Sequence, residues 1–246
     1  MRLRADKLGP AVRQKYLNQV SQKLDIHPLF WDLGHWCMYV PGRPDTKAHL
    51  SSMNQLYASN SIACQLLRER VKVWAERSAG MVPTICNEPV GGDSVEQKKL
   101  MRWSDVKDNR EMEERVKWPR MKSHTRALEK LLRVYENDPS RLLDISRYCL
   151  VFENMSNLTN CLGLIITDDN VRVERLKNRM SPDFDTSETG GYRDVCINLK
   201  VVNKVAQSLG AELAICEVQL LLESFAHLKT AEGHQRYVHV RNSRAT

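Results

Sequence analysis

A single carboxylate stands in an otherwise apolar, strand-like segment near the end of the 246-residue chain. In "LAICEVQLLL" the apolar residues Cys216, Val218 and Leu220 alternate with Glu217 and Gln219. Successive side chains of a strand point to opposite faces of a sheet. We therefore expect Glu217 on the face that does not form the core.

Asp144 is a second carboxylate in a comparable position, because it opens "DISRYCLVF", which also reads as a strand. Mg²⁺ prefers oxygen ligands and shares its remaining coordination positions with water and phosphate. If the two strands are neighbours, Asp144 and Glu217 could hold this ion together. Taken alone the pattern is weak, since isolated carboxylates on strands usually face solvent.

Basic residues form two clusters that would suit a phosphorylated ligand. The first lies before and along an expected helix: Arg120, Lys122, Arg126 and Lys130. The second lies on an expected short basic strand: Arg172, Arg175, Lys177 and Arg179. Phosphoryl transfer depends mostly on positioning and on neutralising charge on the transferred group. Each cluster by itself is also what an ordinary solvated surface contains.

An aromatic ring stands at the start of another expected strand, in "GGYRDVCINLK", residues 190–200. Tyr192 follows a glycine pair, and Val195, Ile197 and Leu199 then alternate with more polar residues. We expect this ring to be a stacking platform for a nucleotide base. Such stacking is worth about 1–3 kcal/mol and tolerates different bases.

The composition is that of a soluble globular protein, with 42% hydrophobic and 27% charged residues. No apolar run approaches the roughly 18 residues that a membrane-spanning helix needs. The seven cysteines include no CxxC pair, which favours free thiols in a reducing, cytoplasmic setting. The N-terminal sequence lacks the apolar segment of a secretory signal, and a mitochondrial or assembly-bound location stays open. The net charge of +7 suits polyanionic ligands, and it serves solubility equally well.

Three regions follow from the changes in pattern along the chain. Residues 1–80 are expected to be mainly helical, 81–117 a linker followed by a charged helix, and 118–246 a domain of helices and strands. Within the last region, "SHTRALEKLLRVY" predicts a helix whose Leu128, Leu131, Leu132 and Tyr135 face the core. The order of these elements predicts an α+β fold, in which helices flank a mixed β-sheet.

The motifs of residues 118–240 resemble the RelA/SpoT-like synthetase domain, a nucleotidyltransferase-related family that makes alarmones. In chain order they are "RMKS", "LEKL", "DISRYCLVF", "RLKNRM", "GGYRDVCINL", "CEVQL" and "KTAEGHQRYV". Each motif is short, but their shared order and spacing are specific. The resemblance implies a pyrophosphokinase that needs Mg²⁺ and transfers the β,γ-diphosphate of ATP to the 3′-hydroxyl of a nucleotide.

On the donor side, the resemblance implies roles for five residues. Arg120 and Lys122 match the basic pair that grips the phosphates of ATP, with Lys130 in support. Asp144 and Glu217 are similar to the two acids that bind Mg²⁺. The glutamate also matches the residue that activates the attacking 3′-hydroxyl.

On the acceptor side, Tyr192 is similar to the tyrosine on which the acceptor base stacks. A basic segment near the phosphates is matched by Arg175, Lys177 and Arg179. Positions that shape the site are matched by Gln219 and His234, for which a packing role is an equally good interpretation.

Two departures from the family pattern concern the acceptor. The loop before Tyr192, "SPDFDTSETGG", is acidic, and Cys196 stands where family synthetases commonly have histidine. The resemblance favours a guanine nucleotide as the acceptor, and these departures leave an adenine nucleotide or the 3′ end of tRNA as alternatives. No histidine is followed by aspartate, so we do not expect the metal-dependent hydrolase half of bifunctional family members.

Two other functions remain open from the sequence. The domain could be a catalytically inactive structural or interaction module, with residues 1–110 as the region that contacts a protein partner, since they match no part of the family. It could also be an RNA- or ribosome-directed member, as the basic charge suggests.

Overall fold

The computed structural model describes residues 52–90 and 93–227. The expected helix at residues 11–24 and the site residue His234 lie outside these ranges. None of the helices in the described ranges is long and apolar enough to cross a membrane. The six cysteines within them are all free thiols, as the sequence predicts.

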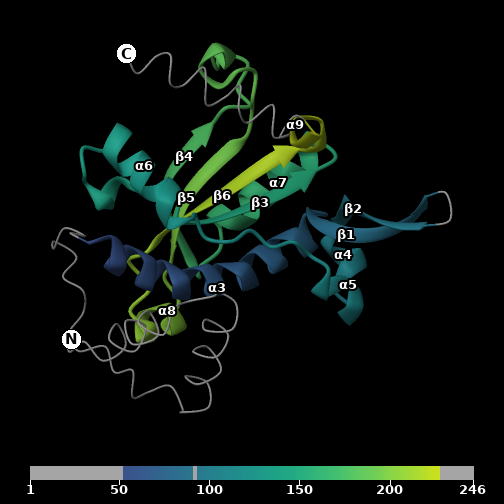
Figure 1. Ribbon diagram of the computed structural model, residues 1–246, viewed down its shortest axis with the longest axis horizontal. Coiled ribbons are helices and arrows are strands. Elements are labelled where there is room, and N and C mark those ends of the chain that lie inside the picture. The colour runs from purple at the N-terminus through teal and green to yellow at the C-terminus, as the bar shows by residue number, and fades with distance from the viewer. Residues whose placement is uncertain (1–51, 91–92, 228–246) are drawn as a thin grey trace.

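Six strands form one mixed sheet in the order β2-β1-β3-β6-β5-β4 (Figure 1). β3 and β6 are parallel, whereas the other neighbours are antiparallel. The strands are β1 (Met81–Val90), β2 (Asp93–Arg102), β3 (Ser146–Phe152), β4 (Val171–Asn178), β5 (Val195–Val201) and β6 (Ile215–Leu222). This mixed sheet with flanking helices confirms the predicted α+β fold.

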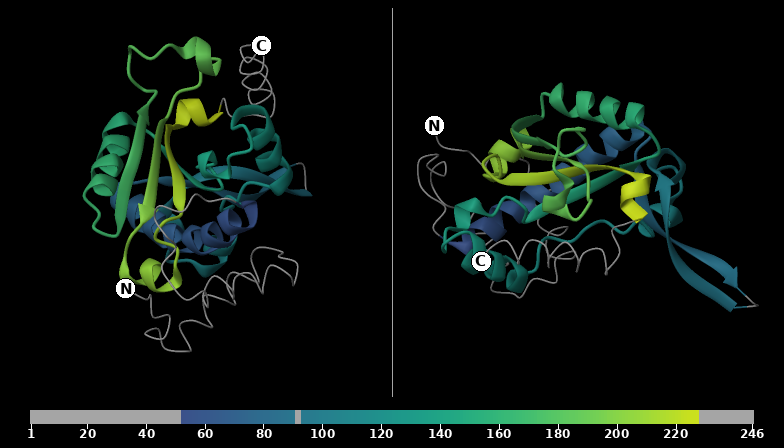
Figure 2. Two further views of the ribbon diagram at one scale, coloured as in Figure 1. Left: turned by 90° about the vertical axis from the view of Figure 1, so that its left-hand side faces the viewer. Right: turned by 90° about the horizontal axis from the view of Figure 1, so that it is seen from above.

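The helices differ greatly in length, and two of them supply most of the helical core. α3 (Met53–Arg77) and α7 (Met155–Ile166) pack against the sheet on the same side (Figure 2). The remaining described helices are α4 (Trp103–Val106), α5 (Arg110–Glu114), α6 (His124–Val134), α8 (Lys204–Leu209) and α9 (Glu223–His227), with 3₁₀ turns at Pro139–Arg141 and Thr186–Thr189.

Two buried hydroxyl groups fix which face of β3 lies against α3. Ser146 Oγ donates to the carbonyl of Asn60 at 2.9 Å, and the Tyr148 hydroxyl donates to the carbonyl of Cys64 at 3.0 Å. The even-numbered residues of β3 therefore face α3, on what we call the covered face. The odd-numbered residues of β3 and β6 lie on the other side, the open face.

Residues 81–102 form a β-hairpin, so the expectation of a linker followed by a charged helix is wrong there. β1 and β2 pair over their whole length, from Met81 with Arg102 to Val90 with Asp93. Only Gly91 and Gly92 separate the paired ends in the sequence, and a glycine pair is a strong hairpin signal as well as a linker signal. The charged residues of β2 suit an edge strand, which must avoid pairing with other chains.

The apolar face of α6 is narrower than the sequence predicts. Ala127 and Leu131 are buried, against Ile145 of the chain just before β3. Leu128 and Leu132 are 37% and 67% exposed, so the expectation that they face the core is wrong. α6 contacts its neighbours along one stripe only, because it packs at the end of the sheet and not across a face (Figure 1).

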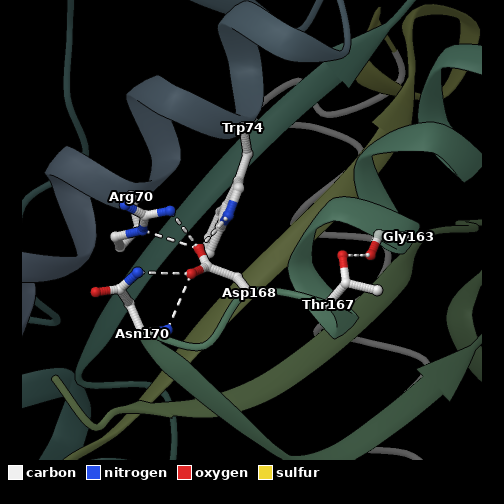
Figure 3. A network of polar contacts seen from close by, with 6 residues as sticks. All are labelled: Arg70, Trp74, Gly163, Thr167, Asp168 and Asn170. Carbon is white, nitrogen blue, oxygen red and sulfur yellow. Dashed lines mark hydrogen bonds and ion pairs between the residues drawn. The ribbon is translucent and has the colours of Figure 1, made fainter.

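A buried carboxylate ties the turn before β4 to α3. The Asp168 side chain, 5% exposed, accepts hydrogen bonds from Arg70 at 2.6 and 2.9 Å and from Trp74 Nε1 at 2.8 Å (Figure 3). Its other oxygen accepts from the backbone and side chain of Asn170. Burial pushes the pKa of Asp168 upward, but these donors outweigh burial, so its pKa lies below the ordinary value.

We predict that Asp168→Asn lowers the free energy of unfolding by about 3 kcal/mol at neutral pH, because Arg70 loses its partner. A depressed carboxyl pKa stabilises the fold above its ordinary value, and the stabilisation disappears as the pH falls through the folded-state pKa. Urea unfolding should therefore show the difference from wild type shrinking in acid. Asp169→Asn, at an exposed neighbouring position, is the matched control. A pH-independent loss would contradict this account.

Candidate functional site

Four polar residues form a row across the open face of the sheet. Glu217 of β6 pairs with Arg147 of β3 on one side and with Asn198 of β5 on the other. Asn198 in turn pairs with Arg175 of β4 and accepts a hydrogen bond from its Nε at 3.0 Å. The sequence expectation that Glu217 stands away from the core agrees with this placement.

A second row lies one step further along the same face. It consists of Cys149, Gln219, Cys196 and Lys177. Gln219 Nε2 donates to Glu217 Oε1 at 3.0 Å, which links the two rows and orients the carboxylate. Burial, with Glu217 and then Asp194 contributing, raises the pKa of Cys196 to about 12. This thiol is therefore neutral at physiological pH, and it cannot act there as a base.

Asp144, which lies just before β3, forms ion pairs with two lysines. Its Oδ2 lies 2.5 Å from Lys122 Nζ and 3.1 Å from Lys130 Nζ. Burial pushes the pKa of Asp144 upward, but Lys130 and Lys122 outweigh burial and hold it below its ordinary value. Its Oδ1 is buried and has no hydrogen-bond partner. One oxygen of this carboxylate thus holds two ammonium groups together, and its other oxygen is still able to accept a hydrogen bond or to bind a cation.

The two lysines respond differently to this shared carboxylate. Burial, together with the neighbouring cations Lys130 and Arg147, lowers the pKa of Lys122 despite its contact with Asp144. For Lys130 the attraction of Asp144 outweighs burial and raises the pKa. Lys122 is therefore the more easily discharged of the two.

The chain around Lys122 is held in place by backbone contacts. Its N–H donates to the carbonyl of Ile145 at 2.9 Å, and its carbonyl accepts from the Tyr57 hydroxyl at 2.7 Å. Arg120 and Arg126 are exposed nearby in sequence. Only Lys122 and Lys130 of the first basic cluster therefore converge on the acid.

The two candidate metal ligands do not lie side by side, since Glu217 is on β6 and Asp144 lies two residues before β3. Arg147 is the register partner of Glu217, and Asp144 precedes Arg147 by three residues. At about 3.3 Å per residue this places the backbones roughly 10 Å apart along the strands. No group of three or more His, Cys, Asp or Glu residues within the described ranges could hold a metal ion. A shared Mg²⁺ stays a prediction.

Tyr192 lies at the far end of the same face. It is half-buried and packs on an apolar cluster formed by Met81, Val151 and Leu221. Its hydroxyl donates to Asp194 Oδ2 at 3.0 Å, and burial raises its pKa far above the ordinary value. Gly190 and Gly191 before it have φ of 61° and 88°, a conformation that other residues rarely adopt. The ring therefore has a fixed position.

Asp194 and Arg179 form a buried ion pair beside this ring. Arg179 donates to Asp194 Oδ1 through Nε and Nη2, both at 2.7 Å, and the Asp194 side chain is fully buried. Arg193 braces the acidic loop by donating to the carbonyl of Ser181 at 2.6 Å. Asp185 accepts from the Ser187 backbone N–H within that loop. At least one acidic side chain of the loop thus stabilises the fold of the loop itself.

Sequence reasoning gave no role to two members of the central row. Arg147 lies between Ser146 and Tyr148 in β3. Strand alternation alone therefore puts its side chain on the face opposite that of the even-numbered core residues. Asn198 is only 1% exposed and lies between Glu217 and Arg175. Both lie on polar positions of predicted strands, but only the cross-strand register shows that they flank Glu217.

Comparisons with known proteins concern the fold. No protein-family profile matches the chain, and no curated protein matches it by sequence. Small alarmone synthetase 1 from Bacillus subtilis is similar over 50% of this chain and 61% of its own, with 16% identity and a TM-score of 0.40. Small alarmone synthetase 2 from the same organism is similar over 77% and 81%, with 14% identity and a TM-score of 0.46. The chain thus spans less than two thirds of the first.

A third solved structure contains the Type VI effector Tas1 in complex with its immunity protein. It is similar over 80% of this chain and 76% of its own, with 13% identity and a TM-score of 0.42. A structure of small alarmone synthetase 1 with its product pppGpp bound is also similar, with a TM-score of 0.39. At these identities the likeness concerns the fold alone.

We predict that Asp144→Asn destabilises the fold by about 2–4 kcal/mol at neutral pH, because two ammonium groups then face each other without a counter-charge. The pKa of Asp144 is depressed, so its stabilising effect is present above the ordinary carboxyl pKa and is lost as the pH falls through the folded-state value. Urea unfolding at neutral and acidic pH measures both. Glu129→Gln, exposed on α6, should change little. An equal loss at every pH is the contrary result.

Proposed function

We propose that this chain is a nucleotide pyrophosphokinase. It transfers the β,γ-diphosphate of ATP to the 3′-hydroxyl of an acceptor nucleotide and releases AMP. The observation that carries the proposal is the position of Glu217 on the open face, between the Lys122–Lys130–Asp144 cluster and the Tyr192 ring. A carboxylate placed between a cation cluster and an aromatic platform suits reaction between two nucleotides.

The donor phosphates bind at the lysine cluster. Lys122 and Lys130 already converge on one oxygen of Asp144, and both are partly buried. A triphosphate offers them more negative charge than one carboxylate does, so binding exchanges one anionic partner for another. Exposed Arg120 lies two residues before Lys122, where it adds a further cation for the phosphates.

Mg²⁺ fits the residues present, as a companion of ATP. Asp144 Oδ1 is a buried acceptor without a donor, which suits a cation ligand, whereas the two lysines disfavour a free divalent ion at that place. Asp144 and Glu217 would hold the ion, with phosphates and water completing its coordination. When bound, it neutralises charge on the phosphate oxygens.

Glu217 acts as the general base. It takes the proton of the acceptor 3′-hydroxyl while that oxygen forms a bond to the β-phosphorus and the bond from the β-phosphorus to the oxygen shared with the α-phosphorus breaks. Gln219 keeps the carboxylate oriented through its 3.0 Å hydrogen bond. Arg147 and Arg175 in the same row stabilise negative charge on the transferred group.

The acceptor base stacks on Tyr192. Because its hydroxyl is bound to Asp194 and its body rests on the apolar cluster, the ring is positioned before the ligand arrives. A guanine nucleotide is the favoured acceptor, and stacking alone accommodates an adenine nucleotide or the 3′ end of tRNA as well.

A non-catalytic interaction module is the second candidate function. It is favoured by the observation that several cations of the site already have carboxylate partners, namely Arg179 with Asp194 and both lysines with Asp144. In that case the open face maintains the fold, and residues 1–110 contact a protein partner. The two functions differ in whether nucleotides bind at all.

We predict that the purified protein transfers labelled diphosphate from ATP, with Mg²⁺ present, to at least one of GDP, GTP, an adenine nucleotide or tRNA. Glu217→Gln should lower the rate by about 10²-fold or more, because a general base is lost. Glu114→Gln, on α5 and 69% exposed, is the matched control and should retain full activity. No transfer to any of these acceptors would favour the second function.

Tyr192→Ala should raise the KM for the acceptor by about 5- to 150-fold and leave the KM for ATP nearly unchanged, since stacking is worth about 1–3 kcal/mol. Tyr192→Phe keeps the ring and loses only the bond to Asp194, so it should stay within a few-fold of wild type. If Tyr192→Ala lowers stability but leaves nucleotide binding unchanged, the ring has only a packing role.

A further inference from the structure

Strand β4 contains a β-bulge within its basic segment. Val173 pairs with Leu199 and Arg175 pairs with Asn198, so Glu174 has no partner of its own on β5. A bulge inserts one extra residue into one strand and changes the face to which the following side chains point.

Without the bulge, the cations after it would lie on the covered face. Val171 and Val173 are two residues apart and pair with core positions of β5. Uninterrupted pairing would continue this series and place Arg175 opposite Ile197, which is fully buried in the core. A guanidinium group at that place would enter the hydrophobic layer beneath α7.

The bulge instead puts two cations on the open face. Arg175 pairs with Asn198 and binds its Oδ1 at 3.0 Å, and Lys177 pairs with Cys196. Asn198 is the neighbour of Glu217, so Arg175 falls into the row that contains the proposed base. The extra residue in β4 thus decides on which face of the sheet Arg175 and Lys177 lie.

The Glu174 carboxylate contacts two cations, one from β4 and one from β5. Its Oε1 lies 2.8 Å from Arg172 Nε and 3.2 Å from Lys200 Nζ. Arg172 and Lys200 are register partners immediately before the bulge. Burial pushes the pKa of Glu174 upward, but the contacts with Arg172 and Lys200 outweigh burial and lower it. These two ion pairs fix the unpaired residue in place.

We propose that Glu174 is a positioning residue, which holds the bulge and so turns Arg175 and Lys177 onto the open face, where they bind phosphate groups. The identification of these groups as those of a bound nucleotide rests on the proposed function. The placement of the cations does not, because it follows from the register of β4 with β5.

Titration calorimetry with inorganic tripolyphosphate tests this inference without any turnover. Glu174→Gln removes both ion pairs and should weaken binding by about tenfold, through loss of a charge-assisted contact. General electrostatic attraction predicts the opposite, because this variant is more positive than wild type. The charge swap Glu174→Lys with Lys200→Glu keeps the net charge and should restore binding to within about twofold. Arg110→Ala, 93% exposed on α5, is a control for lost positive charge.

Urea unfolding of each variant separates positioning from loss of the fold. Equal or tighter binding by a folded Glu174→Gln variant overturns the inference, as do weak binding by the charge swap and an absence of binding by wild type. A wild-type protein that binds tripolyphosphate in this Glu174-dependent way but transfers no diphosphate removes the proposed function and keeps the inference.

Discussion

The packing of α3 against the parallel strands β3 and β6 is the constraint on which the rest of the structure depends. The hydroxyl groups of Ser146 and Tyr148 bind backbone carbonyls of α3, and both lie in the interior. If β3 slipped by one residue, these buried hydroxyl groups would lose the carbonyls to which they donate, and every side chain of the strand would move to the opposite face. The same contacts that build the core therefore determine that Glu217 and Arg147 lie on the opposite side.

The open face combines positive groups with carboxylates that already neutralise them. Asp144 lies between two lysines, Asp194 binds Arg179, and Glu174 binds Lys200. Such pairing keeps concentrated positive charge compatible with a folded, ligand-free protein, since buried charges without partners are costly. A phosphorylated ligand must also displace these carboxylates. Its binding free energy then contains only the difference between the attraction of the cations to phosphate and their attraction to the carboxylate. In the proposed function, this competition favours highly charged phosphates over weakly charged ligands.

Strand alternation made much of the fold and part of the site predictable. The buried positions of β6 follow the sequence pattern closely, because Cys216, Val218 and Leu220 form one apolar face. In β5 Cys196 and Asn198 are buried as well, which alternation within the strand does not predict. The hairpin of residues 81–102 was not predictable in the same way, since its glycine pair and charged residues are equally typical of a linker and a solvated helix. The exposure of Leu132 was not predictable either. Periodicity shows that a helix has an apolar stripe, but it does not show how much of that stripe packs against other elements.

The sequence by itself determined the types of group available: two carboxylates, two basic clusters and a tyrosine after a flexible glycine pair. It also determined the face of its own strand on which Glu217 stands, since alternation within one strand is a local property. Only the tertiary structure decided which groups meet, that Lys122 and Lys130 converge on Asp144 whereas Arg126 does not, and that Asn198 and Arg147 flank Glu217. The physical reason is that register and bulges arise from pairing between strands that are distant in the chain. The sequence of one strand does not specify which residues of another strand it will pair with.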